Sequence, residues 1–524
     1  METLYNGIIL PDQWPPRDAD PASSQPMRVP YLESPLKSAI PIDVGRQLFV
    51  DEFLIESNTL TQTFHRPVKH PCNPVFFPTT EYELNERLPP ATIPKCGGLW
   101  YDERDRCFKM WYMASYLGAM AYATSDDGLH WERPILDVVP GTNLVLPLHL
   151  HPDSGTVWLD RETTDHSQRF KMLLREPNRV PDCCFPGLMM TSPDGIHWSE
   201  PIPTGPMEDR STFFFNPFRQ RWVQSIRENI KPRGRCRNYW EAKEFFESGR
   251  WGKGEPPFWV GADCKDEAGD APPQLYNLDA VAYESLMLGF FQIHKGPPNQ
   301  VGEACGQPKL TELVLSTSRD GFHWHRPDRT PFIGADRQAG AWEYGYIEST
   351  GGICVIVGDE LWFYYSAYAG DAKRITKDWR TNGMYANGAT GLAKLRRDGF
   401  VSMRARHPGA ALTTRPLIFS GGHLFVNISS AGALLRVACL GEDNRVIPPF
   451  SLENCRGFCG NATCAEIRWN DGANLAALAG RPVKLLFSMD RGDLYSFWVT
   501  DSIRGASHGY LAAGGPGLGH SRDM

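Results

Sequence analysis

Four carboxylates stand at the borders of short apolar segments, where a side chain can reach a site without entering a core: Asp153, Asp209, Glu284 and Glu348. Two carboxylates that share one site push their pKa values apart, so that one keeps a proton and the other stays ionised. Such a pair can cleave an acetal, because one group protonates the leaving oxygen and the other activates water or attacks carbon. We predict Asp209 as the base or nucleophile and Glu284 as the acid. Asp153 would hold hydroxyls or tune the acid, and Glu348 is the reserve for either role.

Other polar residues near these carboxylates could bind a substrate. An arginine can hydrogen-bond a ligand or fix a neighbouring carboxylate, and an aromatic hydroxyl can do both. The predicted substrate-binding residues are Arg210, Arg227, Tyr283, His151 and Asp279.

A seven-residue phrase of the form Ser-x-Asp-Gly-x-His-Trp occurs three times, at Ser125–Trp131, Ser192–Trp198 and Ser318–Trp324. The copies begin 67 and then 126 residues apart, which is one period followed by two. Self-similarity at this period indicates a repeat architecture, and four short strands with their turns fill one such unit. Ser and Asp provide acceptors for local backbone N–H groups and Gly tolerates positive φ, so each phrase is predicted to close a hairpin.

An aromatic-rich strand recurs five times, as in Phe108–Met113 and Leu361–Tyr365, each time after a shorter apolar segment. Five such units predict an all-β fold with a five-bladed β-propeller. The short segments would be the innermost strands, and these surround a central funnel. Carboxylates at their starts would therefore converge from different blades.

The remaining segments extend this domain organisation. Residues 1–44 are rich in Pro and are predicted to wrap the surface. The propeller is expected at 45–404 as the catalytic domain. Strand-like runs separated by Gly, Asn and Asp turns predict a C-terminal β-sandwich at 405–500. Residues 501–524 are expected to form a frayed tail.

Composition excludes several classes of partner. The net charge is −7 with no long run of Lys or Arg, which argues against nucleic acid or an anionic membrane as the main partner. No segment approaches the length of a membrane helix, and the start lacks a signal-peptide pattern, so we expect a cytoplasmic protein. The 13 Cys residues are predicted to be reduced thiols. The sequence predicts no cofactor and no metal, and it leaves the oligomeric state open.

The blade count and the Ser-x-Asp-Gly-x-His-Trp phrases carry a resemblance that covers roughly residues 45–404. The chain resembles the five-bladed propeller glycoside hydrolases, the invertase-like and arabinanase-like furanosidases that include glycoside hydrolase family 32. This resemblance implies an axial pocket in which acids from different blades act on an oligosaccharide or glycoside, often a furanoside.

Two alternatives stay open at this point. The chain could be a glycan-binding propeller without catalytic activity, since fold does not establish function. It could instead be a glycoside phosphorylase, in which the basic stretch Lys231–Arg237 would receive phosphate.

Overall fold

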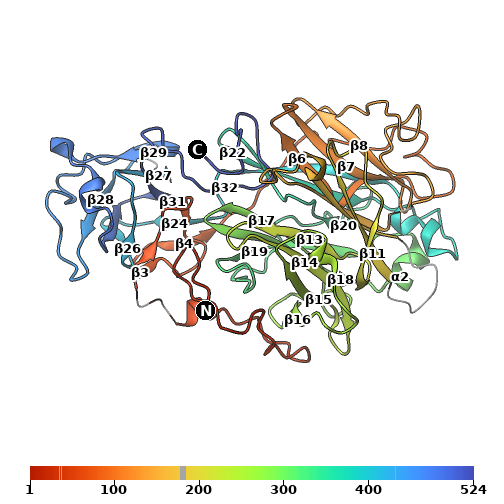
Figure 1. Ribbon diagram of the computed structural model, residues 1–524, viewed down its shortest axis with the longest axis horizontal. Helices are drawn as coiled ribbons and strands as arrows, with labels where there is room; N and C mark the ends of the chain where they lie inside the picture. Colours follow the sequence, from red (N-terminus) through yellow and green to blue (C-terminus); the bar gives the residue numbers. More distant parts are fainter. Residues whose placement is uncertain (35, 37, 151, 177–184, 431) are drawn as a thin grey trace.

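The structure is a computed structural model that describes residues 1–524 except 35, 37, 151, 177–184 and 431. Strands dominate it, as predicted for an all-β fold (Figure 1). The α-helices of the described residues are α1 (Pro30–Glu33) and α2 (Asn299–Cys305). Short 3-10 turns lie at His166–Gln168, Glu247–Gly249, Trp379–Thr381, Gly383–Tyr385, Asn470–Gly472 and Leu475–Leu478. No helix of the described residues is both long enough and apolar enough to cross a bilayer.

Five antiparallel sheets follow one another along the chain. The first contains β6 (Thr92–Asp102), β7 (Cys107–Ala114) and β8 (Ala119–Ser125). The second contains β9 (Ser154–Leu159), β10 (Phe170–Arg175), β11 (Phe185–Ser192) and β12 (Ile202–Met207). The third contains β13 (Thr212–Asn216), β14 (Arg221–Ile230), β15 (Gly234–Ala242) and β16 (Phe258–Gly261).

The fourth sheet contains β17 (Gln274–Glu284), β18 (Leu286–Gly296) and β19 (Leu310–Ser318). The fifth contains β20 (Gly345–Glu348), β21 (Val355–Val357), β22 (Glu360–Tyr368) and β23 (Gly388–Arg396). Its outer edge is β5 (Val68–Lys69), which precedes the first sheet in the sequence. The last sheet is therefore completed by an earlier part of the chain.

Each sheet contacts the next one, and the fifth contacts the first through β22 and β6. The repeated phrases reinforce these contacts, because each turn accepts a hydrogen bond from an aromatic side chain of a neighbouring sheet. Trp111 Nε1 donates to the Gly195 carbonyl at 2.6 Å, and Trp259 Nε1 donates to the Phe322 carbonyl at 2.9 Å. The Tyr364 hydroxyl of the fifth sheet donates to the Gly128 carbonyl of the first sheet's turn at 2.7 Å.

Inside the Ser-x-Asp-Gly-x-His-Trp phrase, side-chain oxygens accept hydrogen bonds from backbone N–H groups. Asp320 Oδ1 accepts from the backbone N–H groups of Phe322 and His323, and Ser318 Oγ accepts from the N–H of Gly321. Gly321 has a φ of +80°, which a side chain would strain. The two other copies make the same bonds, so the prediction of a repeated structural turn is confirmed.

Two further sheets lie at the other end of the long axis (Figure 1). One contains β29 (Asn461–Ile467), β27 (His423–Ser429), β31 (Gly492–Thr500), β24 (Val401–Ala405), β4 (Thr61–Phe64) and β2 (Gln47–Leu48). The other contains β28 (Leu435–Leu440), β30 (Lys484–Met489), β25 (Ala410–Thr414) and β3 (Ile55–Asn58). A short parallel pair joins β1 (Ile40–Pro41) to β26 (Leu417–Ile418). The rings of Phe487 and Phe497 lie 5.2 Å apart between the two sheets, which share one core.

The final segment packs against the rest of the protein, contrary to the frayed tail that we expected. Strand β32 (Tyr510–Leu511) pairs with the end of β17, and residues 509–515 are buried. The Gly-rich composition allows close backbone contact here: a Cβ at Gly515 would lie 1.8 Å from the Ile356 carbonyl oxygen. The glycines of this segment therefore permit close packing, and the predicted frayed tail is wrong for residues 509–515.

Candidate functional site

One group of polar side chains draws on all five consecutive sheets, at the end where their first strands start. We call it the strand-start cluster. It consists of Lys95, Asp153, Asp209, Arg227, Arg235, Tyr276, Lys309 and Tyr346. Lys95 belongs to the first sheet and Tyr346 to the fifth, so this arrangement depends on the contacts between sheets described above.

Asp153 and Lys95 form an ion pair across the first two sheets. Lys95 Nζ lies 2.9 Å from Asp153 Oδ1, and the lysine side chain is almost fully buried. The ring of Tyr116 lies under the same ammonium at 4.7 Å. Lys95 therefore holds Asp153 in one position, and the next residue, Ser154, accepts a hydrogen bond from the Arg210 backbone N–H at 3.3 Å.

Asp209 is the more exposed of the two carboxylates in the cluster. Its side chain keeps 33% of its surface exposed, against 11% for Asp153. Arg227 Nη1 lies 2.5 Å from Asp209 Oδ1 and 2.7 Å from Glu208 Oε2. Burial alone would raise the pKa of Asp209, but the positive charges of Arg227 and Arg235 outweigh it and hold this pKa well below its usual range. Asp209 is therefore an ionised carboxylate near neutral pH.

Tyr276 and Lys309 supply the contribution of the fourth sheet. Lys309 Nζ donates to the Tyr276 hydroxyl at 2.9 Å, and the Tyr346 hydroxyl lies 3.4 Å from the same oxygen. Burial would raise the pKa of Tyr276, but Lys309 and Arg235 lower it to about 8. Burial also lowers the pKa of the Lys309 ammonium. Among the described residues, neither Lys309 nor Arg235 has a carboxylate within ion-pair distance.

Backbone contacts fix Asp209 and Tyr276 beside one another. The guanidinium of Arg237 donates to the carbonyl of Arg210, the residue after Asp209, at 2.7 Å. The same guanidinium donates to the Tyr276 carbonyl. Because one fully buried side chain bridges both carbonyls, the starts of β13 and β17 lie side by side.

Three predicted site residues, Glu348, Arg210 and Asp279, are more deeply buried than the carboxylates of the strand-start cluster. Glu348 has no exposed side-chain surface and pairs with Arg210 Nη1 at 3.2 Å. Arg210 Nη2 also donates to Gln292 at 2.8 Å. Asp279, another predicted residue, accepts hydrogen bonds from Asn277 and Ser349 and is also buried. These contacts join the starts of three sheets and support the cluster from beneath.

Glu284 and Tyr283 lie at the opposite end of β17 from Tyr276. Eight residues of extended strand span roughly 25 Å, so Glu284 cannot act together with Asp209 in one site. The predicted pairing of these two carboxylates is therefore wrong. The strand pattern identified Glu284 as a strand-border residue without showing which end of the fold that border occupies.

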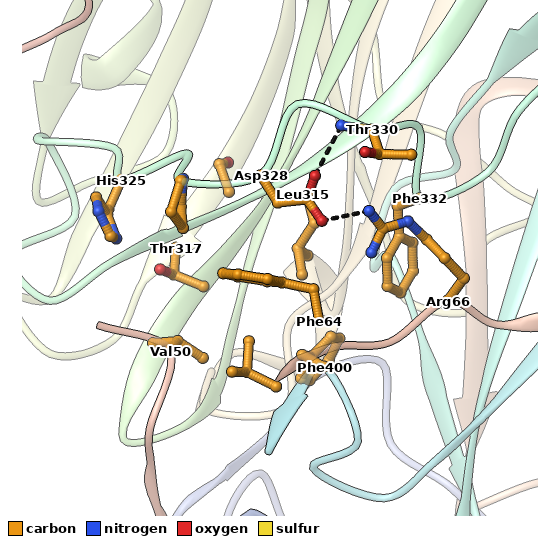
Figure 2. Close-up of a pocket in the computed structure, with 13 residues that line it drawn as sticks. Val50, Phe64, Arg66, Leu315, Thr317, His325, Asp328, Thr330, Phe332 and Phe400 are labelled. Carbon is orange, nitrogen blue, oxygen red and sulfur yellow. Dashed lines mark hydrogen bonds and ion pairs between the residues drawn. The ribbon is translucent and has the colours of Figure 1, made fainter. Parts of the chain in front are cut away.

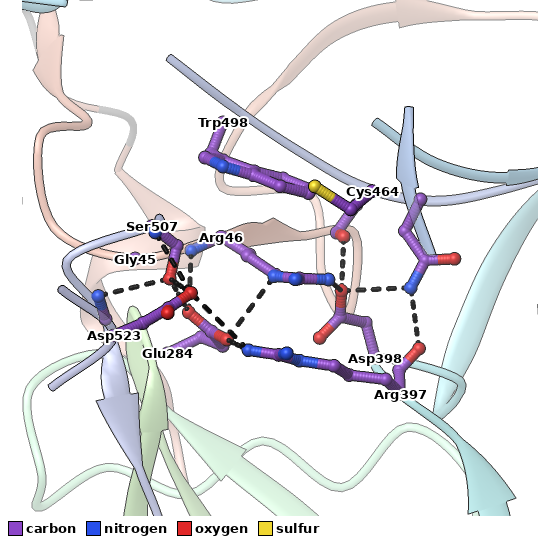
Figure 3. Close-up of polar contacts among 12 residues, drawn as sticks. Gly45, Arg46, Glu284, Arg397, Asp398, Cys464, Trp498, Ser507 and Asp523 are labelled. Carbon is purple, nitrogen blue, oxygen red and sulfur yellow. Dashed lines mark hydrogen bonds and ion pairs between the residues drawn. The ribbon is translucent and has the colours of Figure 1, made fainter. Parts of the chain in front are cut away.

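Glu284 belongs instead to an interface cluster, defined by Arg46, Glu284, Arg397 and Asp398 (Figure 3). Arg397 Nη2 lies 3.1 Å from Glu284 Oε1, and Arg46 Nη1 lies 3.0 Å from Asp398 Oδ2. Both carboxylates are fully buried. Tyr283 donates to Asp398 in the same group. The cluster joins β17 to the C-terminal sheets.

An apolar recess lies at the far end of β19 from Lys309 (Figure 2). Its two charged residues, Arg66 and Asp328, form an ion pair with each other. Asp328 also accepts a hydrogen bond from the Thr330 N–H at 2.9 Å. The rest of the lining includes Phe64, Phe332 and other apolar side chains. Among the described residues that line the recess, Asp328 is the only carboxylate, and it is already paired with Arg66.

The structure thus groups some of the predicted residues and separates others. Asp153, Asp209 and Arg227 share the strand-start cluster, with Arg210, Glu348 and Asp279 beneath it. Glu284 and Tyr283 lie in the interface cluster, and His151 is outside the described residues. Lys309 and Tyr346 were not predicted, because the predicted acids stand at the starts of first strands, and Arg235 was predicted only as part of the basic stretch Lys231–Arg237. Lys309 stands directly before a third strand, β19, so a pattern limited to first strands does not include it.

Comparisons with known proteins find similarity in structure but no match in sequence. Neither the protein-family models nor the curated proteins contain a match to this sequence. Among solved structures, the chain is similar to an N-acetylgalactosamine deacetylase from F. plautii, with 14% identity, a TM-score of 0.43, and coverage of 66% of this chain and 96% of that one.

Two glycosidase-family structures are similar to the same degree. One comes from the GH130 family of mannoside phosphorylases, which contains glycoside hydrolases (12% identity, TM-score 0.40, 65% and 97% coverage). The other is a thermostable family-43 glycoside hydrolase (12% identity, TM-score 0.39, 60% and 94% coverage). Similarity at this level relates strand arrangements only loosely, so the proposal below rests on the geometry of the cluster.

Proposed function

We propose that this chain is a glycoside hydrolase whose five consecutive sheets form a five-bladed β-propeller with the strand-start cluster in its axial pocket. The two remaining sheets would form the β-sandwich, with the domain boundaries predicted above. One observation carries the proposal: five sheets each place polar side chains in one cluster, and its most exposed carboxylate, Asp209, is held ionised by arginine.

In the proposed reaction Asp209 is the base or nucleophile. Arg227 orients its carboxylate, and Asp153, held by Lys95, accepts hydrogen bonds from sugar hydroxyls. The proposed substrate is a furanoside, as the resemblance of the repeated phrases implies. Glu284 has no part in this scheme.

Phosphorolysis is the second candidate, and the surplus of positive charge favours it. Lys309 and Arg235 lack carboxylate partners among the described residues, and Arg235 belongs to the basic stretch Lys231–Arg237. An anion such as phosphate would complement these charges. In that case phosphate would take the place of water as the nucleophile.

A panel of aryl furanosides and pyranosides tests the proposal, assayed with and without inorganic phosphate. We expect the wild type to release aglycone without phosphate, and Asp209→Asn to lower kcat/KM by about 10²-fold or more. Turnover that requires phosphate would replace hydrolysis by phosphorolysis. Binding of a glycoside with no turnover under either condition would leave a glycan-binding protein and contradict both enzymatic schemes.

A further inference from the structure

The strand-start cluster has a base but lacks an evident proton donor. Asp209 is held ionised, and Asp153 is engaged by the buried ammonium of Lys95. Glu208 shares the Arg227 guanidinium with Asp209, and Glu348 is paired with Arg210. Acetal cleavage with an ordinary leaving group still needs a proton delivered to the departing oxygen.

We propose that Tyr276 is the proton donor of this site, an inference that rests on the proposed glycosidase function. Its hydroxyl is the hydrogen-bond acceptor of Lys309 Nζ at 2.9 Å, and the Arg237 bridge fixes its backbone next to that of Asp209. Lys309 would stabilise the tyrosinate that forms when the proton leaves. A phenol is an acid that works near neutral pH only when cations lower its pKa.

The surroundings of Tyr276 favour this role from several elements. The Arg235 guanidinium lies 4.9 Å from the centre of the Tyr276 ring, and the Arg210 guanidinium lies 5.9 Å from it. The pKa of Tyr276, lowered to about 8, leaves the phenol mostly protonated at neutral pH yet ready to ionise. The titratable and charged groups that face it are Lys309, Arg235, Arg210, Asp209, Arg227, Tyr346, Tyr116, Tyr385 and His294.

The bond between the anomeric carbon and the leaving oxygen breaks, and the electron pair of that oxygen takes the phenol proton of Tyr276. Water forms the new bond to carbon and loses its proton to Asp209. Solvent then carries this proton from Asp209 back to the tyrosinate, so no further reagent is consumed.

The first test compares leaving groups on Tyr276→Phe. The dinitrophenolate of a dinitrophenyl glycoside leaves without protonation. The alkoxide of an alkyl glycoside with the same sugar needs a proton to leave. We expect Tyr276→Phe to lower kcat/KM on the alkyl glycoside by about 10²-fold or more and to change it little on the dinitrophenyl glycoside. Asp209→Asn should lower both, and Tyr122→Phe, which alters a buried tyrosine of β8, should lower neither.

A second measurement does not depend on activity. Near-ultraviolet absorbance follows tyrosinate formation, and the wild type should titrate one tyrosine near pH 8 that is missing in Tyr276→Phe and shifted upward in Lys309→Met. An equal loss on both glycosides, no loss on either, or no tyrosine titrating near pH 8 in an active wild type would overturn this role alone. A wild type inactive on every glycoside would overturn the proposed function and this role together.

Discussion

The two ends of β17 carry two different kinds of ionic cluster. At the end of the strand, Glu284 and Asp398 are fully buried against Arg46 and Arg397, and each carboxylate has a guanidinium within 3.1 Å. At its start, Tyr276 adjoins a cluster in which Asp209 stays a third exposed and Lys309 has no carboxylate partner among the described residues. Both clusters contain strongly shifted groups, so a shifted pKa does not distinguish them.

The difference lies in exposure and in charge balance. A buried, matched set of charges gains nothing from a ligand, and its role is to hold two parts of the chain in register. A set that is partly exposed at Asp209 and holds the buried cation Lys309 without a carboxylate partner among the described residues costs folding free energy, and a bound substrate can offset that cost. Strained or unbalanced electrostatics are typical of functional sites for this reason.

Breaking the interface cluster should have the largest effect on stability. Asp398→Ala removes one of the two carboxylates paired with the buried Arg46, and we expect a loss of about 3–5 kcal/mol in the free energy of unfolding, measured by urea denaturation. Asp443→Ala is the control, because its pair with Arg445 is exposed and should be worth no more than about 1 kcal/mol. Similar losses for both variants would contradict the distinction.

Removing a cation that has no carboxylate partner should increase the free energy of unfolding. Lys309 is 1% exposed, and Lys309→Met keeps the length of its side chain while removing its charge. We expect thermal unfolding to show a gain of about 1 kcal/mol in stability. The same variant should lose turnover. Lys484→Met is the matched control: Lys484 is also buried but lies 2.7 Å from Glu56, and its removal should destabilise the protein. A loss of stability in Lys309→Met would mean that its charge is compensated within the fold.

The contributions of the two clusters to stability should change with pH in opposite directions. Burial raises the pKa of Glu284, so its stabilising contribution is complete below about pH 4.3 and declines as pH rises through its folded-state value. Arginines outweigh burial and lower the pKa of Asp209, so its contribution is complete above about pH 3.9 and declines as pH falls. Urea unfolding between about pH 3 and about pH 7 measures both.

The expected result is a stability difference from wild type that shrinks with rising pH for Glu284→Gln and grows with rising pH for Asp209→Asn. Slopes of the same sign in the two variants would remove the electrostatic contrast between the two ends of β17.

Repeated patterns were the part of the fold that the sequence predicted well. The three Ser-x-Asp-Gly-x-His-Trp turns form as expected because their hydrogen bonds are local and depend only on neighbouring residue types. The pairing of β5 with β23 joins residues more than 300 positions apart, and no local pattern encodes it.

The site was predictable where position along a strand decides it. Asp153 and Asp209 stand directly before first strands, and this placement alone brought them together. Glu284 stands at the other end of such a strand, a distinction that requires knowing where β17 starts. Tyr276 and Lys309 were overlooked as a pair because β18 lies between β17 and β19 in the sheet, and only the folded chain shows that the two side chains meet across it.

The most direct test of this account is a comparison of Asp209→Asn with Glu284→Gln on the glycoside that the wild type cleaves fastest, with rates divided by the folded fraction. We predict that Asp209→Asn loses about 10²-fold or more of kcat/KM and keeps its fold, while Glu284→Gln keeps wild-type turnover per folded molecule. Full activity in Asp209→Asn, or a loss confined to Glu284→Gln, would place the chemistry at the other end of β17 and contradict the account.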